Sequence, residues 1–252
     1  MKNKERQIRE YLKYLRLAGM RQSYKEITRL AVKEILNYED YLLTLLEEEA
    51  TVRHNNRINR YLKASKLPLE KNLDNFDIKR LPLIASQKLN ALLDGGFIDR
   101  TENLLVFGNP GSGKTHLVAA LGNELIYLGK RVLFTKCSLL VQDLLNAKKD
   151  LMLAKKLKKL SKFDAIIIDD IGYVQQSREE MEVLFTLLAD RYERSSIIIT
   201  SNLPFSKWEK IFKDPMITAA AIDRLVHHSV IIELNIESYR IQHAKSKTGK
   251  TK

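Results

Sequence analysis

The sequence predicts an α/β domain with a five-stranded parallel sheet flanked by helices, preceded by a small all-α domain. Three observations lead to this prediction. From about residue 78, short apolar runs alternate with longer stretches of helical periodicity, which is typical of a parallel sheet covered on both faces. A glycine-rich segment joins the first run to the helix that follows it. Before residue 67, apolar residues recur at helical spacing.

The N-terminal helical domain is expected to span residues 1–66. Gly19 is predicted to end its first helix. A later helix should begin near Asn37, whose side chain can cap it ahead of two acidic residues. Neither Gly nor Pro occurs between Asn37 and Pro68, so this helix can continue through the basic stretch at residues 53–60. Residues 67–77 are predicted to be a linker with little regular structure.

The α/β domain is expected to span residues 78–240. Its strands are predicted at residues 104–106, 131–134, 165–168, 197–200 and 230–234. Helices are expected to begin near Lys114, Leu139, Arg178 and Ala219. The final residues, 241–252, are polar and basic and are predicted to form a disordered tail.

The composition of the chain indicates which kind of partner and which cellular compartment to expect. The chain has 252 residues, with 43 Lys and Arg against 31 Asp and Glu, a formal net charge of +12. Such an excess favours a polyanionic partner such as nucleic acid, although solubility alone is the simpler explanation. A single cysteine, Cys137, excludes an internal disulfide framework. No apolar run approaches a membrane span, and no signal peptide is evident, so we expect a cytoplasmic protein without a membrane partner.

The glycine-rich segment matches the phosphate-binding pattern G-x-x-x-x-G-K-[ST] at every fixed position. Its residues are Gly108, Asn109, Pro110, Gly111, Ser112, Gly113, Lys114 and Thr115. The glycines let the backbone turn so that its N–H groups surround phosphate oxygens, and the following helix N-terminus favours negative charge. Lys114 is expected to reach the β- and γ-phosphates of ATP, and the Thr115 hydroxyl to bind Mg²⁺.

Two carboxylates follow the apolar run that ends at residue 168. Asp169 is expected to hold the Mg²⁺ shell, and Asp170 to orient or deprotonate the attacking water. Acidic residues often simply end strands, but their position about 50 residues after the phosphate loop favours this assignment.

Two further polar residues are candidates for catalysis. Asn202 follows the fourth apolar run and is a candidate to sense the γ-phosphate or position water, with ordinary turn chemistry as the alternative. Arg224 lies in a later helical stretch and is a candidate arginine finger, with a surface ion pair to Asp223 as the alternative. His227 and His228 have no companion at metal-ligand spacing, so we interpret them as structural polar groups.

Basic residues on two stretches are candidate contacts to the DNA backbone. A solvated helix face explains such a run equally well. The candidates are Lys148, Lys149, Lys155, Lys156, Lys158 and Lys159, with Arg53, Arg57 and Arg60 as the alternative surface.

Four motifs in this order resemble the IstB family, the AAA+ helper ATPases of bacterial insertion sequences, whose relatives are the DnaC-type helicase loaders. They are the loop from Gly108 to His116 and Leu117, the run ending Asp169-Asp170-Ile171-Gly172-Tyr173, Thr200-Ser201-Asn202-Leu203-Pro204, and Ile222-Asp223-Arg224-Leu225. The resemblance covers most of the chain, and it adds His116 to the expected nucleotide contacts.

The resemblance implies an AAA+ domain that self-assembles on double-stranded DNA with nucleotide at subunit interfaces, and that stimulates a cognate transposase. It also implies the sensor role of Asn202 and the finger role of Arg224. Many AAA+ proteins have Asp-Glu where this chain has Asp169-Asp170, and the shorter second acid predicts slow turnover without a partner. A replicative helicase loader is the alternative function. A small-molecule P-loop kinase is a third hypothesis, against which no lid-like basic insertion for an acceptor phosphate is evident.

Overall fold

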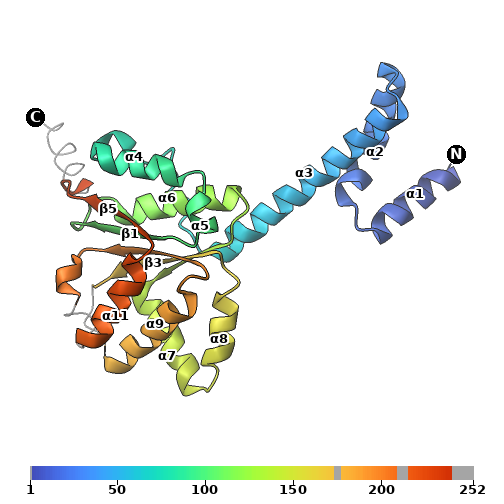
Figure 1. The fold of residues 1–252 in the computed structure, drawn as a ribbon. Coiled ribbons are helices and arrows are strands. Elements are labelled where there is room, and N and C mark those ends of the chain that lie inside the picture. Colours follow the sequence, from blue (N-terminus) through green and yellow to red (C-terminus); the bar gives the residue numbers. More distant parts are fainter. Residues whose placement is uncertain (1, 173–176, 209–214, 240–252) are drawn as a thin grey trace, which may run out of the picture. The chain divides into compact units, whose positions relative to one another are not determined.

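The computed structural model describes residues 2–172, 177–208 and 215–239. The chain divides into two compact units, residues 1–60 and 61–252 (Figure 1). No helix within the described ranges is both long enough and apolar enough to cross a membrane. The tail predicted at residues 241–252 lies outside the described residues.

The first unit is helical, as predicted. It contains α1 (Lys2–Tyr14), α2 (Ala18–Glu34) and most of α3 (Tyr38–Ser65). Asn37 caps α3, since its Oδ1 accepts a hydrogen bond from the Asp40 N–H at 2.8 Å. The prediction that Gly19 ends a helix is wrong. Gly19 lies in the first turn of α2, where a Cβ would come within 2.9 Å of the Glu49 Cα, so the glycine permits a close approach to α3.

A small apolar core and one buried carboxylate hold this unit together. Met20, Tyr24, Ile27 and Leu45 pack together in it. Glu49 is also buried, and its carboxylate accepts hydrogen bonds from Arg53 Nε at 2.6 Å and from the Met20 N–H at 3.1 Å. Burial opposes the charge of Glu49, but these hydrogen bonds outweigh burial and lower its pKa.

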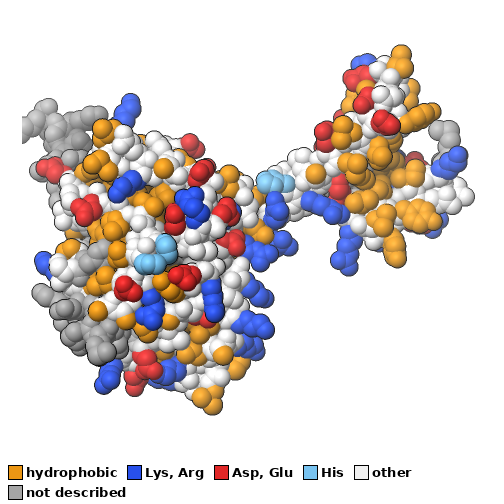
Figure 2. All heavy atoms as spheres, in the orientation of Figure 1, with side chains coloured by type: hydrophobic (Ala, Val, Ile, Leu, Met, Phe, Trp, Pro, Cys, Tyr) orange, Lys and Arg blue, Asp and Glu red, His pale blue; other side chains and the backbone are white. Residues whose placement is uncertain are grey.

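The surface of the first unit is rich in apolar side chains. Figure 2 shows hydrophobic groups gathered on the face of the unit that is in view. The large exposed ones are Ile8, Tyr11, Tyr14, Leu15, Leu30, Val32, Ile35, Tyr38, Leu42, Leu43 and Leu46. The unit therefore exposes more apolar side chains than it packs in its own core.

The second unit is built on the predicted parallel sheet of five strands. These are β1 (Asn103–Gly108), β2 (Val132–Lys136), β3 (Ala165–Ile171), β4 (Ser196–Ser201) and β5 (Ser229–Leu234). Their order is β2-β3-β4-β1-β5, and all neighbours run parallel. The carboxyl ends of β1 and β3 therefore lie on either side of the end of β4. This topology brings the loop after β1, the acids of β3 and the polar end of β4 to one edge of the sheet.

Helices cover both faces of this sheet (Figure 1). One face packs against α7 (Cys137–Lys149), α8 (Leu153–Leu160), α9 (Arg178–Arg191) and α11 (Pro215–Val226). The other face packs against α6 (Lys114–Tyr127), where a Cβ on Gly122 would lie 2.8 Å from Ile167. Because successive strand residues point to opposite faces, the isoleucines of β3 contact both layers, which explains its unbroken apolar run.

Before β1 the chain forms three short elements that the sequence did not predict. They are the 3-10 turn η1 (Ile78–Arg80), α4 (Leu83–Leu92) and α5 (Gly96–Asp99). Residues 67–77 form neither helix nor strand, in agreement with their irregular sequence. A further 3-10 turn, η2 (Phe205–Lys207), follows β4.

Candidate nucleotide-binding site

The predicted phosphate loop connects the strand β1 to the start of α6. Gly111 and Gly113 adopt φ angles of 79° and 97°, which favour glycine because a Cβ is strained in this region. These angles turn the backbone ahead of α6. The first N–H groups of that helix have no partner within the helix and form a ready site for an anion.

Lys114 places a positive charge inside this loop. Its side chain is buried, and its Nζ donates hydrogen bonds to the carbonyl oxygens of Gly108 at 2.8 Å and Asn109 at 3.0 Å. Ser112 Oγ is also buried and has no hydrogen-bond partner within the described ranges. A buried cation and a hydroxyl oxygen without a partner are together suited to a charged phosphate.

Thr115 and Asp169 form the hydrogen-bonded pair expected of a magnesium site. Thr115 Oγ1 donates to the Asp169 carboxylate at 2.9 and 3.2 Å. Thr200 Oγ1 donates to Asp169 Oδ1 at 2.7 Å from the neighbouring strand β4. Burial raises the pKa of Asp169, an effect that the Thr200 hydrogen bond opposes and that the nearby Asp170 charge reinforces. Hydroxyl and carboxylate oxygens are the ligands that Mg²⁺ prefers.

The backbone of Asp170 is in the left-handed region, and this residue is therefore placed differently from the adjacent Asp169. Its φ is 62°, and the pairing of β3 with β4 shifts register between Ile168 and Ile171. The Asp170 N–H donates to Thr200 Oγ1 at 2.8 Å. Thr200 therefore links the two adjacent acids, since its hydroxyl donates to the carboxylate of one and accepts from the backbone of the other. The bulge leaves Asp170, but not Asp169, lining the cavity in front of the loop.

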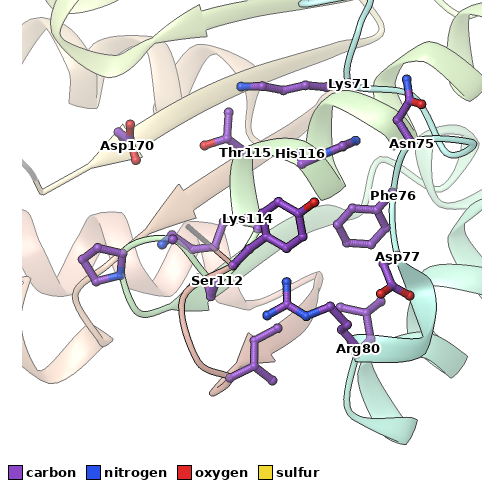
Figure 3. Close-up of a pocket in the computed structure, with 16 residues that line it drawn as sticks. Lys71, Asn75, Phe76, Asp77, Arg80, Ser112, Lys114, Thr115, His116 and Asp170 are labelled. Carbon is purple, nitrogen blue, oxygen red and sulfur yellow. The ribbon is translucent and has the colours of Figure 1, made fainter. Parts of the chain in front are cut away.

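That cavity has a volume of about 420 Å³, within the usual range for small-ligand sites. Its lining residues are Lys71, Asn75, Phe76, Asp77, Arg80, Leu81, Pro110, Gly111, Ser112, Gly113, Lys114, Thr115, His116, Asp170, Ile236 and Tyr239. In Figure 3, Asp170 lies at one end and Phe76, Asp77 and Arg80 at the other, with Lys114 and Ser112 between them.

Half of this lining was absent from the sequence prediction. Two regions supply it: residues 71–81 before the sheet, and Ile236 and Tyr239 after β5. The stretch predicted as a linker also contacts His116, whose Nε2 lies 3.1 Å from the Asn72 carbonyl and whose ring lies 5.0 Å from that of Phe76. The predicted nucleotide contact His116 thus packs against the linker. The only sequence signal was the presence of aromatic and basic residues in these stretches.

The two remaining catalytic candidates do not line this cavity. Asn202 is half-buried just beyond β4, and its Oδ1 has no hydrogen-bond partner in the described part of the chain. Arg224 lies on α11, donates to the Ala220 carbonyl at 3.1 Å and stacks 5.0 Å from the ring centre of Phe185 on α9. Arg224 therefore contacts its own helical layer and not the cavity of its own chain.

Comparison with known proteins identifies the family. A model of the IstB-like ATP binding protein family matches residues 10–247, which include the loop and both acids. The chain belongs to the IstB family. A putative insertion sequence ATP-binding protein of Sinorhizobium fredii is 42% identical, covering 90% of this chain and 76% of that protein. The insertion sequence IS5376 putative ATP-binding protein of Geobacillus stearothermophilus is 37% identical, covering 99% of each.

Solved structures share the fold of this IstB family member. The DnaC helicase loader has a TM-score of 0.56 at 18% identity, covering 70% of this chain and 99% of the loader. AMPPCP-bound DnaA from Aquifex aeolicus has a TM-score of 0.58 at 19% identity, covering 74% of this chain and 57% of DnaA. At these identities the likeness shows the fold alone, which is the predicted AAA+ P-loop fold.

The lysine candidates for DNA binding lie on α7 and α8. Leu153, Leu157 and Leu160 of α8 face the core, which leaves its lysines on the outer side. Lys155, Lys158 and Lys159 are exposed, as is Lys149 at the end of α7. In contrast, Lys156 pairs with Asp143 at 2.8 Å, and Lys148 pairs with Glu182 at 2.9 Å.

The arginine candidates belong to α3. Arg53 is committed to its own unit, since it pairs with Glu49 and donates to the Arg16 carbonyl at 3.2 Å. Arg57 lies 3.2 Å from His54 Nδ1, and both Arg57 and Arg60 are exposed.

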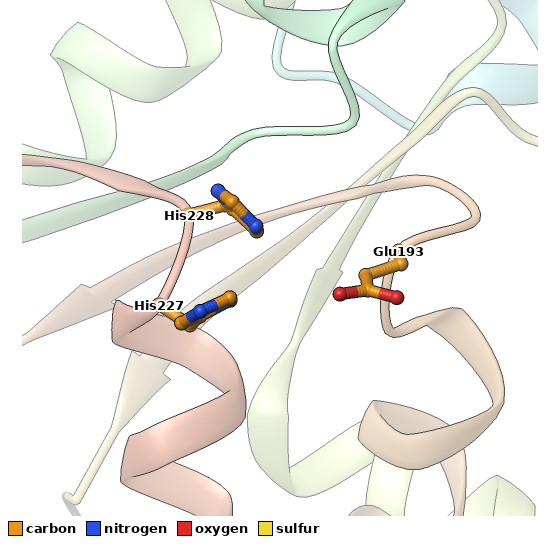
Figure 4. Close-up of side chains that lie close together, drawn as sticks. All are labelled: Glu193, His227 and His228. Atoms are coloured by element: carbon orange, nitrogen blue, oxygen red, sulfur yellow. The ribbon is translucent and has the colours of Figure 1, made fainter.

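One group of side chains resembles a metal site that the IstB motifs do not include. Glu193, His227 and His228 are exposed, and their ligand atoms lie within 4.8 Å of one another (Figure 4). His227 Nδ1 also lies 3.3 Å from the Tyr192 hydroxyl. Glu193 is a companion that the sequence spacing did not suggest, and the interpretation of both histidines as structural polar groups stays a prediction.

Proposed function

We propose that this chain is an ATP-dependent, DNA-binding AAA+ regulator of transposition, which self-assembles on double-stranded target DNA and stimulates a partner transposase. Membership of an insertion-sequence family supports the biological setting. The observation that carries the proposal is the hydrogen-bonded set of Thr115, Asp169, Thr200 and Asp170 beside Lys114 and a nucleotide-sized cavity.

ATP binding with Mg²⁺ follows from the chemistry of these groups. The loop N–H groups and Ser112 surround the phosphates, and the Lys114 ammonium exchanges backbone carbonyls for β- and γ-phosphate oxygens. Thr115 and Asp169 hold Mg²⁺, which neutralises phosphate charge when it is bound. The residues 109–113 and His116 complete the contacts near the phosphates.

The remaining polar residues have roles in the hydrolysis of ATP. Asp170 accepts a proton from water as the water oxygen bonds to the γ-phosphorus and the bond to the β-phosphate oxygen breaks, releasing ADP. Asn202 senses the γ-phosphate. Arg224 acts on the nucleotide of a neighbouring subunit, which agrees with its position outside its own cavity.

Asp170→Asn should separate binding from hydrolysis. Asparagine tolerates the left-handed backbone at this position, so the bulge should persist, but an amide does not accept the proton. We expect ATP affinity within about threefold of wild type and hydrolysis slower by about a hundredfold or more. Calorimetric ATP titration and a phosphate-release assay measure the two effects. Parallel loss of binding and hydrolysis would instead assign Asp170 to the metal or to the structure.

DNA binding should depend on the exposed lysines of α8. Replacing Lys155, Lys158 and Lys159 with alanine should reduce the slope of log affinity against log salt concentration by about 2 to 3, because fewer counterions are released. The affinity for all duplex sequences should fall alike. The matched control replaces Lys148 and Lys156, whose ion pairs already neutralise them, and should change the slope less. An unchanged slope in the triple variant would move the DNA surface to Arg57 and Arg60.

A helicase-loading function makes a different prediction about partners. Both functions use the same ATPase core, so ATP assays do not distinguish them. Co-purification of the full chain with its transposase supports the transposition function, whereas co-purification with a hexameric replicative helicase supports the alternative.

A further inference from the structure

The segment that follows β5 lies against the phosphate loop. The Tyr239 N–H donates to the Gly111 carbonyl at 3.0 Å. A Cβ on Gly111 would lie 2.1 Å from Ser238 Oγ, so this approach requires glycine. We call residues 235–239 the C-terminal strap. We propose that the strap is the base-recognition wall of the nucleotide site, with Tyr239 and Arg80 as specificity-determining residues; this inference rests on the proposed ATP binding.

Arg80 ties the strap to the opposite side of the cavity. Its guanidinium donates to the Glu237 carbonyl at 3.2 Å and lies 5.0 Å from the centre of the Tyr239 ring. Arg80 belongs to η1, which precedes the sheet, whereas Glu237 and Tyr239 follow its last strand. One cationic side chain therefore connects two segments about 157 positions apart in sequence and fixes the orientation of an aromatic ring beside the loop.

A second aromatic side chain faces the same space. Phe76 lines the cavity together with Tyr239, and its Cε2 would lie 3.5 Å from a Cβ on Gly113. Leu81 and Ile236 add apolar surface to the lining. Flat aromatic and guanidinium groups bind the faces of nucleobases by stacking. This part of the cavity therefore suits a planar base, while the loop suits polyphosphate.

The arrangement of the cavity fixes the direction of the nucleotide. Asp170 lies at one end and Phe76 and Arg80 at the other, with Lys114 between them (Figure 3). A γ-phosphate directed toward Asp170 places the base toward Phe76, Arg80 and the strap. The strap is hydrogen-bonded to Gly111 of the loop. Binding of the base therefore also stabilises the contact between the strap and the loop.

Comparing ATP with inorganic tripolyphosphate tests this assignment. Tripolyphosphate offers the loop its phosphates but offers the strap no base. With Mg²⁺ present, Tyr239→Ala should weaken ATP binding about 10- to 100-fold, as expected for loss of base stacking, and change tripolyphosphate binding less than about twofold. Tyr239→Phe should restore ATP affinity because it retains the ring. The matched control is Tyr127→Ala, which removes an exposed tyrosine that does not line the cavity.

Amide exchange gives a readout without mutation. ATP should slow hydrogen exchange at the Tyr239 N–H, and tripolyphosphate should slow it less. Unchanged ATP affinity in Tyr239→Ala, or an equal loss for both ligands, would overturn the base-recognition role while leaving the phosphate site intact. If the wild-type protein binds neither ATP nor tripolyphosphate, the proposed function itself is overturned, and the inference with it.

Discussion

Lys114→Ala is expected to weaken Mg-ATP binding by about a hundredfold or more. The ammonium makes charge-assisted hydrogen bonds to phosphate that no other lysine in the loop replaces, and losing a buried charged partner costs about 3 kcal/mol. Calorimetric titration of the purified full chain measures the change. ATP hydrolysis should be lost with binding, because Lys114 acts before any chemical step.

Two controls make the Lys114 result specific. Lys149→Ala removes the same charge from an exposed site at the end of α7 and should leave ATP affinity unchanged. Because Lys114 also donates to the Gly108 and Asn109 carbonyls, thermal unfolding without nucleotide shows whether the loop still folds. A folded Lys114→Ala protein that binds ATP with wild-type affinity would contradict the nucleotide-site assignment.

Arg224→Ala is expected to slow hydrolysis in the assembled state by about a thousandfold. A finger acts on charge that develops during phosphoryl transfer, so ATP affinity of the isolated subunit should stay within about twofold of wild type. Hydrolysis measured with duplex DNA, beside ATP titration of the subunit, separates these two effects. Arg194→Ala is the matched control, since this arginine is exposed and its pairing with Asp190 is long, at 3.9 Å.

Mixing experiments test whether Arg224 acts between subunits. Arg224→Ala and Lys114→Ala each damage a different half of a composite site. Their mixture can therefore form interfaces that combine an intact Lys114 with an intact Arg224, and we expect partial recovery of hydrolysis. An Arg224→Ala protein that assembles and hydrolyses ATP at the wild-type rate would reduce this residue to its contacts with Phe185 and Ala220.

The sequence predicted those parts of the protein in which neighbouring residues carry the information. The apolar run ending at residue 168 specifies a strand buried on both faces, and the loop from Gly108 to Thr115 is contiguous. Parallel topology then brings strand ends together, so the proximity of Thr115 and Asp169 followed from the sheet. The helix start at Asn37 was predictable because its cap is local.

Other features depended on distant contacts that no local pattern contains. Gly19 was assigned to a helix end because glycine often occurs there, but its neighbour is Glu49 on another helix. The aromatic and basic wall at Phe76, Arg80 and Tyr239 joins two irregular segments without periodicity. Thr200 was recognised only as part of a polar strand end. Its link between the two acids depends on a bulge in β3 that composition does not reveal.

The sparse core of the first unit has a thermodynamic consequence. Among its described residues, four buried hydrophobic side chains with three partly buried ones packed against them form the core of a unit of 60 residues, and they provide little burial to offset conformational entropy. The large exposed side chains from Ile8 to Leu46 offer additional area to any molecule that covers them. By mass action, such a molecule raises the free energy of unfolding of this unit in proportion to the logarithm of its concentration. The fraction of N-terminal units that is folded therefore reports how many of them are bound by such a molecule.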